Sequence, residues 1–233
     1  MDYSYLAAHW ADVRNRVARA CREAGREPSE VTILPVSKTF GAEVVRAAAS
    51  LGLRRFGENR VQEVREKAPL LADCDIAWVI IGPLQTNKAR DVARLVHEVQ
   101  TLDRIELAEA LDHRLQLEGR ALDVLVQVKT SPEESKHGLA SDRLPGLLAA
   151  LRRFDTLRVR GLMTIATHTD DEVEVRRCFR QLRELRDAMA DDGHDLPRLS
   201  MGMSGDFALA IAEGATEVRI GSAIFGARPA TVS

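Results

Sequence analysis

Apolar positions along the chain follow two alternating spacings, and these predict alternating helices and strands. Leu6, Trp10, Val13 and Val17 recur at helical spacing, and Gly25 ends this run as a residue just beyond a helix C-terminus would. Short apolar, β-branched runs predict strands at 31–37, 53–56, 76–81, 97–102, 122–128, 157–163, 197–201 and 216–220. Helix-like segments lie between them at 41–51, 58–68, 87–95, 104–117, 141–153, 171–190 and 205–213.

This alternation predicts parallel strands joined by crossover helices. The chain has 233 residues, a length that α/β barrels reach as one domain. We therefore predict an α/β fold, a single (β/α)₈ TIM-type barrel with an extra N-terminal helix; a doubly wound open sheet is the alternative. Because no Pro/Gly/Ser-rich linker interrupts the pattern, we expect one domain over 1–233, with the leading helix at 1–25 and the barrel at 31–228.

Composition narrows the classes of function. The chain is 45% hydrophobic and has a formal net charge of −2 with both signs interspersed, which disfavours a nucleic-acid partner. The charged N-terminus is unlike a secretory signal, and no apolar run approaches the length of a membrane span. Cys21, Cys74 and Cys178 are scattered, and the histidines show no metal-ligand spacing. We expect free, buried or half-buried thiols, no metal site and a cytoplasmic location.

The first predicted strand ends in Ser37-Lys38-Thr39, which places a lysine at the mouth of the barrel. Function in such barrels lies at the C-terminal ends of the strands. A lysine at a strand end is ordinarily a solvated charge. The functional alternative is an amine that forms a Schiff base, and it needs apolar walls or nearby cations to be neutral near pH 7. The apolar run 33–36 would supply such a wall.

The last two strand ends predict a phosphate site, because barrels often bind phosphate there at a short helix. Gly221 and Ser222 precede a short apolar turn; glycine admits close approach of backbone amides, and serine adds a hydroxyl donor. Ser200, Gly202 and Ser204 precede another helix, for which Ser204 is better explained as the N-cap. A lysine and a phosphate cradle together indicate pyridoxal 5′-phosphate (PLP) or the sugar phosphate of an aldolase.

Seven short motifs occur in order along nearly the whole chain. They are VSKTF at 36–40, FGENRVQE at 56–63, IGPLQTNK at 81–88, EESKHGL at 133–139, GLMTI at 161–165, LSMGMSGD at 199–206 and VRIGSAIFGAR at 218–228. With this ordered set, the chain resembles the pyridoxal phosphate homeostasis protein family, small PLP-binding barrels related to the N-terminal domain of alanine racemase.

The resemblance implies roles for individual residues. Lys38 matches the Schiff-base lysine, Arg219 the arginine that faces the pyridine nitrogen, and Asn59 a polar residue near the cofactor ring. The other implied cofactor-binding residues are Ser200, Gly221 and Ser222 around the phosphate, and Met163 and Met201 lining the pocket. No residue is expected to be catalytic.

The chain also departs from the family pattern. Val79 follows Trp78 where the family has a histidine, and Arg60 replaces a tyrosine. Lys136 matches a family lysine near the site. These departures leave Lys38 and the predicted phosphate loops unchanged.

Arg219 also bears on whether the protein is a carrier or an enzyme. Many PLP enzymes set an acidic residue against the pyridine nitrogen, whereas an arginine is cationic and disfavours the protonated ring. Alanine racemase also uses an arginine but adds a second domain with a catalytic tyrosine, and the only tyrosines here are Tyr3 and Tyr5 on the first helix. The implied function is PLP binding and vitamin B6 homeostasis, with little or no turnover.

Two alternatives stay open: a PLP-dependent, racemase-like amino-acid enzyme and a cofactor-free Schiff-base aldolase. The expected partners are PLP and PLP-requiring apo-enzymes, with neither nucleic acid nor a membrane. Because the chain ends just after its last barrel unit, the dimer contacts of the racemase are expected to be missing and the protein to be a monomer.

Overall fold

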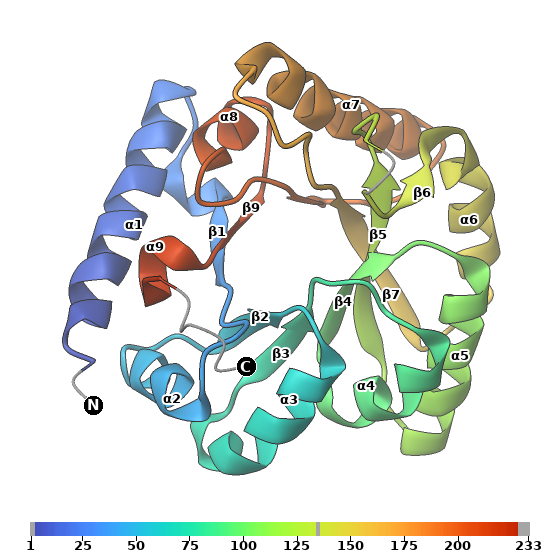
Figure 1. The fold of residues 1–233 in the computed structure, drawn as a ribbon. Helices are drawn as coiled ribbons and strands as arrows, with labels where there is room; N and C mark the ends of the chain where they lie inside the picture. The colour runs from blue at the N-terminus through green and yellow to red at the C-terminus, as the bar shows by residue number, and fades with distance from the viewer. Residues whose placement is uncertain (1–2, 134–135, 228–233) are drawn as a thin grey trace.

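The computed structural model describes residues 3–133 and 136–227. Within these residues, eight parallel strands form a barrel surrounded by helices (Figure 1). The strands are β1 (Thr32–Pro35), β2 (Arg55–Glu58), β3 (Ala77–Ile80), β4 (Glu98–Leu102), β5 (Leu122–Lys129), β7 (Leu157–Met163), β8 (Arg198–Ser200) and β9 (Glu217–Ile220). A two-residue strand, β6 (Leu139–Ala140), pairs with the end of β5. Parts of two motifs (134–135 and 228) and the ends of the expected domain (1–2 and 228–233) lie outside the described residues.

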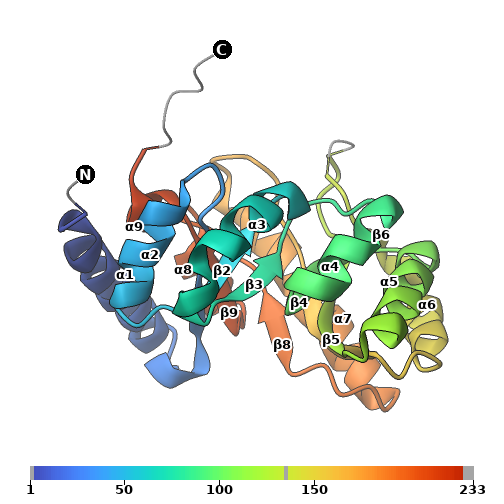
Figure 2. The same cartoon turned by 90° about the horizontal axis from the view of Figure 1, so that it is seen from below.

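The helices follow the strands in the predicted order. They are α1 (Tyr5–Glu23), α2 (Ala42–Ser50), α3 (Val61–Lys67), α4 (Ala89–Leu95), α5 (Ile105–Glu118), α6 (Leu144–Leu151), α7 (Glu172–Asp191), α8 (Phe207–Ala212) and α9 (Ser222–Phe225). Short 3₁₀ helices occupy Pro28–Glu30, Ala68–Cys74, Thr86–Lys88 and Ser141–Arg143. Figure 2 shows α3 and α4 covering the outside of β2, β3 and β4. In the described part of the chain, no helix is both long and apolar enough to cross a membrane.

The sheet closes on itself. Its hydrogen-bonded order is β1-β9-β8-β7-β5-β4-β3-β2, and the two ends of this order meet through a parallel bridge between Val36 and Gly57. The Ser37 amide completes the contact by donating to the Gly57 carbonyl over 3.0 Å. The prediction of a (β/α)₈ barrel with a leading helix is therefore confirmed, and the open-sheet alternative is wrong.

The apolar core lies mainly between the sheet and the helices. Val45 on α2, Val64 on α3, Leu111 on α5 and Phe179 on α7 are all buried there, as the helical spacing of apolar residues requires. All three cysteines are free; Cys21 and Cys178 are buried and Cys74 is half-buried, which confirms the prediction for the thiols.

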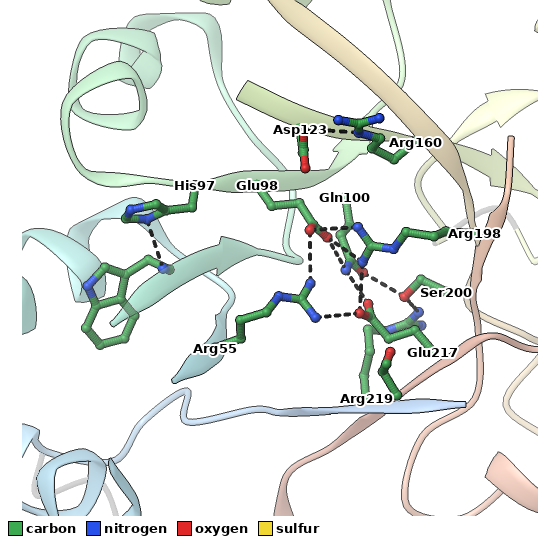
Figure 3. Close-up of polar contacts among 12 residues, drawn as sticks. Arg55, His97, Glu98, Gln100, Asp123, Arg160, Arg198, Ser200, Glu217 and Arg219 are labelled. Atoms are coloured by element: carbon green, nitrogen blue, oxygen red, sulfur yellow. Dashed lines mark hydrogen bonds and ion pairs between the residues drawn. The ribbon is translucent and has the colours of Figure 1, made fainter. Parts of the chain in front are cut away.

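The interior of the barrel is polar near the N-terminal ends of its strands (Figure 3). Arg198 donates to Glu98 and to Glu217, each over 2.8 Å, and Arg55 reaches the same two carboxylates over 2.9 and 3.0 Å. Burial acts to raise the pKa of Glu217, but the two arginines outweigh burial and lower it. Two cations and two anions thus neutralise one another below the mouth of the barrel.

Candidate functional site

A cavity of about 330 Å³ opens at the C-terminal ends of the strands. It is lined by residues from the loops that follow β1, β2, β3, β7, β8 and β9, together with one residue of β9 itself. These residues are Val36, Lys38, Phe40, Asn59, Ile81, Gly82, Pro83, Ile165, Met203, Ser204, Gly205, Arg219, Gly221, Ser222 and Gly226. The barrel therefore brings segments from both ends of the sequence to one small hollow, the place where function was expected.

Lys38 reaches the cavity from a tight turn directly after β1. The Phe40 amide donates to the Ser37 carbonyl over 3.1 Å, and Thr39 has a φ of 71°. Lys38 itself is half-buried. Val36 and Phe40, two positions to either side of it in sequence, also line the cavity, so apolar side chains share its wall with Lys38.

The loops after β8 and β9 place two hydroxyls side by side. Ser222 and Ser204 lie on the cavity wall with their Oγ atoms 3.5 Å apart. Between β9 and Ser222, Gly221 runs close to the first strand, since a Cβ on Gly221 would lie 3.2 Å from the Val36 carbonyl oxygen. Small residues at these positions let the backbone and the hydroxyls approach a ligand closely.

Arg219 supplies a buried positive charge to the cavity from β9 (Figure 3). Its guanidinium donates to the Ser200 hydroxyl and to the Thr164 carbonyl, each over 2.8 Å. Burial lowers the pKa of Arg219 to about 10, while Glu217 and Asp206 act to raise it. Arg219 is therefore cationic at neutral pH and has further N–H donors besides the two that these contacts use.

The ends of β2 and β3 meet tightly at the cavity. A Cβ on Gly82 would lie 2.2 Å from the Asn59 carbonyl oxygen, so only glycine fits there without displacing backbone. The Thr101 hydroxyl donates to the Gly82 carbonyl over 2.8 Å and holds this crossing from β4. The crossing places Asn59 on the cavity wall.

The structure brings together some of the predicted site residues and keeps others apart. Lys38, Asn59, Arg219, Gly221 and Ser222 line the cavity. The residues outside its lining are Met163, Ser200 and Met201, which are fully buried in the barrel, Val79, which is also buried, and Lys136, which pairs with Glu133 over 3.6 Å in the loop after β5. Of these residues, the resemblance implied roles for Met163, Ser200 and Met201, and those roles stay predictions.

Ser204 is not the N-cap of the following helix, so that prediction is wrong. The N-cap of α8 is Asp206, whose carboxylate accepts a hydrogen bond from the Met203 amide over 2.5 Å. The helix begins later than its spacing indicated, and the loop residues Met203, Ser204 and Gly205 face the cavity instead. The flanking glycines, Gly202 and Gly205, were the signal in the sequence for such a loop.

Known proteins resemble this chain over nearly its whole length. Residues 9–229 match the family model described as alanine racemase, N-terminal domain. A protein of Pseudomonas aeruginosa named pyridoxal phosphate homeostasis protein is 44% identical over 225 residues, which is 97% of this chain and 96% of that protein. A protein of the same name in Aquifex aeolicus is 42% identical and covers 93% of this chain and 95% of its own length.

Two solved structures place the chain within the wider fold. PipY of Synechococcus elongatus, solved with PLP bound, superposes with a TM-score of 0.84 at 34% identity, covering 95% of this chain and 100% of that one. Alanine racemase of Clostridium difficile, in complex with cycloserine, gives 0.75 at 13% identity and covers 94% of this chain and 61% of that one, a likeness of fold alone. The chain belongs to the pyridoxal phosphate homeostasis protein family, within the larger family of the alanine racemase N-terminal domain.

Proposed function

We propose that this protein binds PLP through a Schiff base at Lys38 and serves PLP and vitamin B6 homeostasis with little or no turnover. The proposal rests on one observation: Lys38, Ser204 and Ser222 line the same cavity. Its volume of about 330 Å³ lies within the range of small-molecule sites, about 300–1,000 Å³. The PLP-bound relative PipY supports the same ligand.

The residues of the cavity fit the parts of PLP. When bound, PLP supplies an aldehyde that condenses with a primary amine, a flat ring and a phosphate. Lys38 provides the amine, and Val36, Phe40 and Ile81 provide apolar surface for a ring. Gly221 and Ser222 are assigned to the phosphate, and Ser204, which also lines the cavity, is assigned to it as a second hydroxyl.

Arg219 and Asn59 are assigned to the ring. A cationic guanidinium disfavours a proton on a nearby ring nitrogen, so Arg219 would keep the ring a weak electron sink. Ser200 acts through Arg219, because its hydroxyl accepts from that side chain. Met163 and Met201 are buried in the barrel and are assigned to the packing that supports this part of the site.

The cavity offers few groups for proton transfer, which supports a carrier over a racemase-like enzyme. Among the described residues that line it, the titratable side chains are Lys38 and Arg219. Tyr5 lies on α1 and donates to the Phe225 carbonyl over 3.3 Å. A racemase needs an acid or base on each face of its substrate, and beside Lys38 the described lining adds only the guanidinium of Arg219.

The test is the visible absorption of the protein with added PLP, before and after borohydride reduction. We expect a yellow chromophore and, after reduction, a PLP adduct that mass spectrometry locates on Lys38; Lys38→Ala forms neither, and Lys88→Ala serves as the control. A colourless wild type that borohydride links to a sugar phosphate would favour the aldolase. Steady turnover of amino acids by the PLP-loaded protein would favour the racemase-like enzyme.

We further propose that the protein is a monomer and passes PLP to PLP-requiring apo-enzymes. Sedimentation velocity tests the first point, with a dimer as the contradicting result. For the second, a PLP-loaded protein should activate an apo-enzyme faster than the same amount of free PLP mixed with a scavenger of free aldehyde. Equal rates would contradict direct transfer.

A further inference from the structure

A charged cluster, formed by Glu58, Glu63 and Lys67, lies next to the Lys38 turn. Lys67 ends α3 and is buried together with Glu58. Its ammonium donates to Glu58 Oε1 over 2.8 Å, to the Ser37 carbonyl over 3.1 Å and to Glu63 Oε2 over 3.5 Å. An ammonium has three donors, and these three acceptors use all of them.

The charged cluster holds the residues on both sides of Lys38. Glu58 Oε1 accepts from the Ser37 hydroxyl over 2.6 Å. Glu63 Oε2 accepts from the Thr39 amide over 2.7 Å. Ser37 is thus bonded to Glu58 and Lys67, and Thr39 is bonded to Glu63. Lys38, between Ser37 and Thr39, lines the cavity.

The turn needs such a restraint because its backbone is strained. Thr39 has a φ of 71°, in the left-handed region that β-branched residues rarely adopt. It is the third residue of the turn that the Phe40–Ser37 hydrogen bond closes, the position where type II turns usually take glycine or asparagine. Residues in such conformations persist when their surroundings hold them, and here the Thr39 amide is held by Glu63.

Stability alone does not account for the charged cluster. A buried ion pair is often no more stable than apolar side chains of the same size. Glu58 Oε2 is buried without a hydrogen-bond partner in the described part of the chain. Burial raises the pKa of Glu58 to about 7 against the attraction of Lys67, so the carboxylate lies where its charge is disfavoured. What the cluster does provide is a set of contacts to Ser37 and Thr39.

We propose that Lys67 and Glu63 are positioning residues, which lock the turn 37–40 so that the Lys38 amine is presented to its aldehyde. This rests on the proposed function of Lys38. Lys67 anchors the Ser37 carbonyl and orients Glu63, and Glu63 fixes the Thr39 amide. Neither side chain lines the cavity, so each acts through the turn rather than on PLP.

The test uses Lys67→Met, Glu63→Ala and Glu63→Gln. Glu63→Ala removes the acceptor for Thr39 and leaves Glu58 paired with Lys67, so it is expected to fold even where Lys67→Met does not. Glu63→Gln keeps a side-chain carbonyl for the same amide. The control is Arg120→Met, which removes donors to the Ala93 and Val96 carbonyls at the opposite end of the barrel.

Three readouts are compared: the PLP dissociation constant, the rate at which the chromophore forms, and hydrogen exchange of segment 37–40 in the PLP-free protein. Lys67→Met and Glu63→Ala should weaken PLP binding about tenfold or more and slow the chromophore, because small displacements of a reacting group are costly. Both should speed exchange at Thr39. Glu63→Gln should restore most of each property, and Arg120→Met should lower the melting temperature without changing PLP binding.

The outcomes separate this inference from the proposed function. If the wild type forms the chromophore and Glu63→Ala binds PLP equally fast and tightly, the positioning role is overturned while PLP binding stands. Unchanged exchange at Thr39 in both Glu63→Ala and Lys67→Met also overturns it, with or without PLP. A wild type that forms no chromophore overturns the proposed function. The role of Lys67 in presenting Lys38 is then overturned as well.

Discussion

Arg219 donates a hydrogen bond of 2.8 Å to the hydroxyl of Ser200, and that hydroxyl donates a hydrogen bond of 2.7 Å to the side-chain oxygen of Gln100. The Gln100 amide then donates to Glu98 and to Glu217, over 2.7 and 2.5 Å. Carboxylates only accept, so this direction is fixed along the whole chain of bonds. These hydrogen bonds connect Arg219, the cation at the cavity, to the polar interior of the barrel (Figure 3).

Ser200→Ala should therefore lower the stability of the protein. It leaves a buried donor of Arg219 and a buried acceptor of Gln100 unpaired, which costs about 1–3 kcal/mol. Urea unfolding monitored by circular dichroism measures the loss. The free energy of PLP binding should change by less than the free energy of unfolding, because Ser200 does not line the cavity. An unchanged unfolding midpoint would contradict this network.

Ser222→Ala should have the opposite profile. Ser222 is exposed, and its contact with Ser204 is long, at 3.5 Å, so the melting temperature should not change. Loss of a hydrogen bond to a charged phosphate should weaken PLP binding about tenfold or more. Binding of pyridoxal, which lacks the phosphate, should be unaffected. Ser50→Ala on α2 is the matched control, and equal weakening for both ligands would contradict the phosphate assignment.

Gly82→Ala should destabilise the protein and disturb the cavity. The new Cβ would lie 2.2 Å from the Asn59 carbonyl oxygen, and both atoms belong to strand ends that cannot separate freely. Overpacking of this kind costs about 1–3 kcal/mol. Gly146→Ala on α6 is the control, because nothing lies within 4 Å of a Cβ at this position. The higher helix propensity of alanine should raise the free energy of unfolding of this variant by about 0.5–1 kcal/mol. Denaturant unfolding of both variants decides the matter.

Glu58 should make stability fall as pH rises. Burial raises its pKa from 4.5 to about 7, so the folded protein binds this proton more tightly than the unfolded chain does. As pH rises from about 4.5 to about 7, the unfolded chain releases the proton first. The free energy of unfolding therefore decreases over this pH range by about 3 kcal/mol in total. Denaturant unfolding across this range should show a flatter pH dependence for Glu58→Gln than for wild type. The exposed Glu106→Gln is the control, and parallel curves for wild type and Glu58→Gln would contradict the shift.

Much of the fold could be predicted because its signals are local. Apolar spacing located the eight strands of the barrel and eight of its helices, but not β6 or α9. Regular alternation implied parallel strands whose C-terminal ends share one rim. Lys38, Gly221 and Ser222 stand directly after strands, so their place at the rim followed from sequence order. The expected extent of the domain stays a prediction.

What the sequence by itself determined was which residues stand at the rim; which of them face the cavity was decided by tertiary structure. Ser200 and Ser204 lie in one short motif, yet Ser200 is bonded within the barrel and Ser204 lines the cavity. Lys67 looks like an ordinary surface lysine at the end of a helix, and only the packing of α3 against β2 and the turn after β1 buries it beside Ser37. The local sequence pattern determines whether a segment forms a helix or a strand and where that element ends. The partners of a polar side chain, by contrast, come from strands and helices distant in sequence. These contacts form only when the barrel closes.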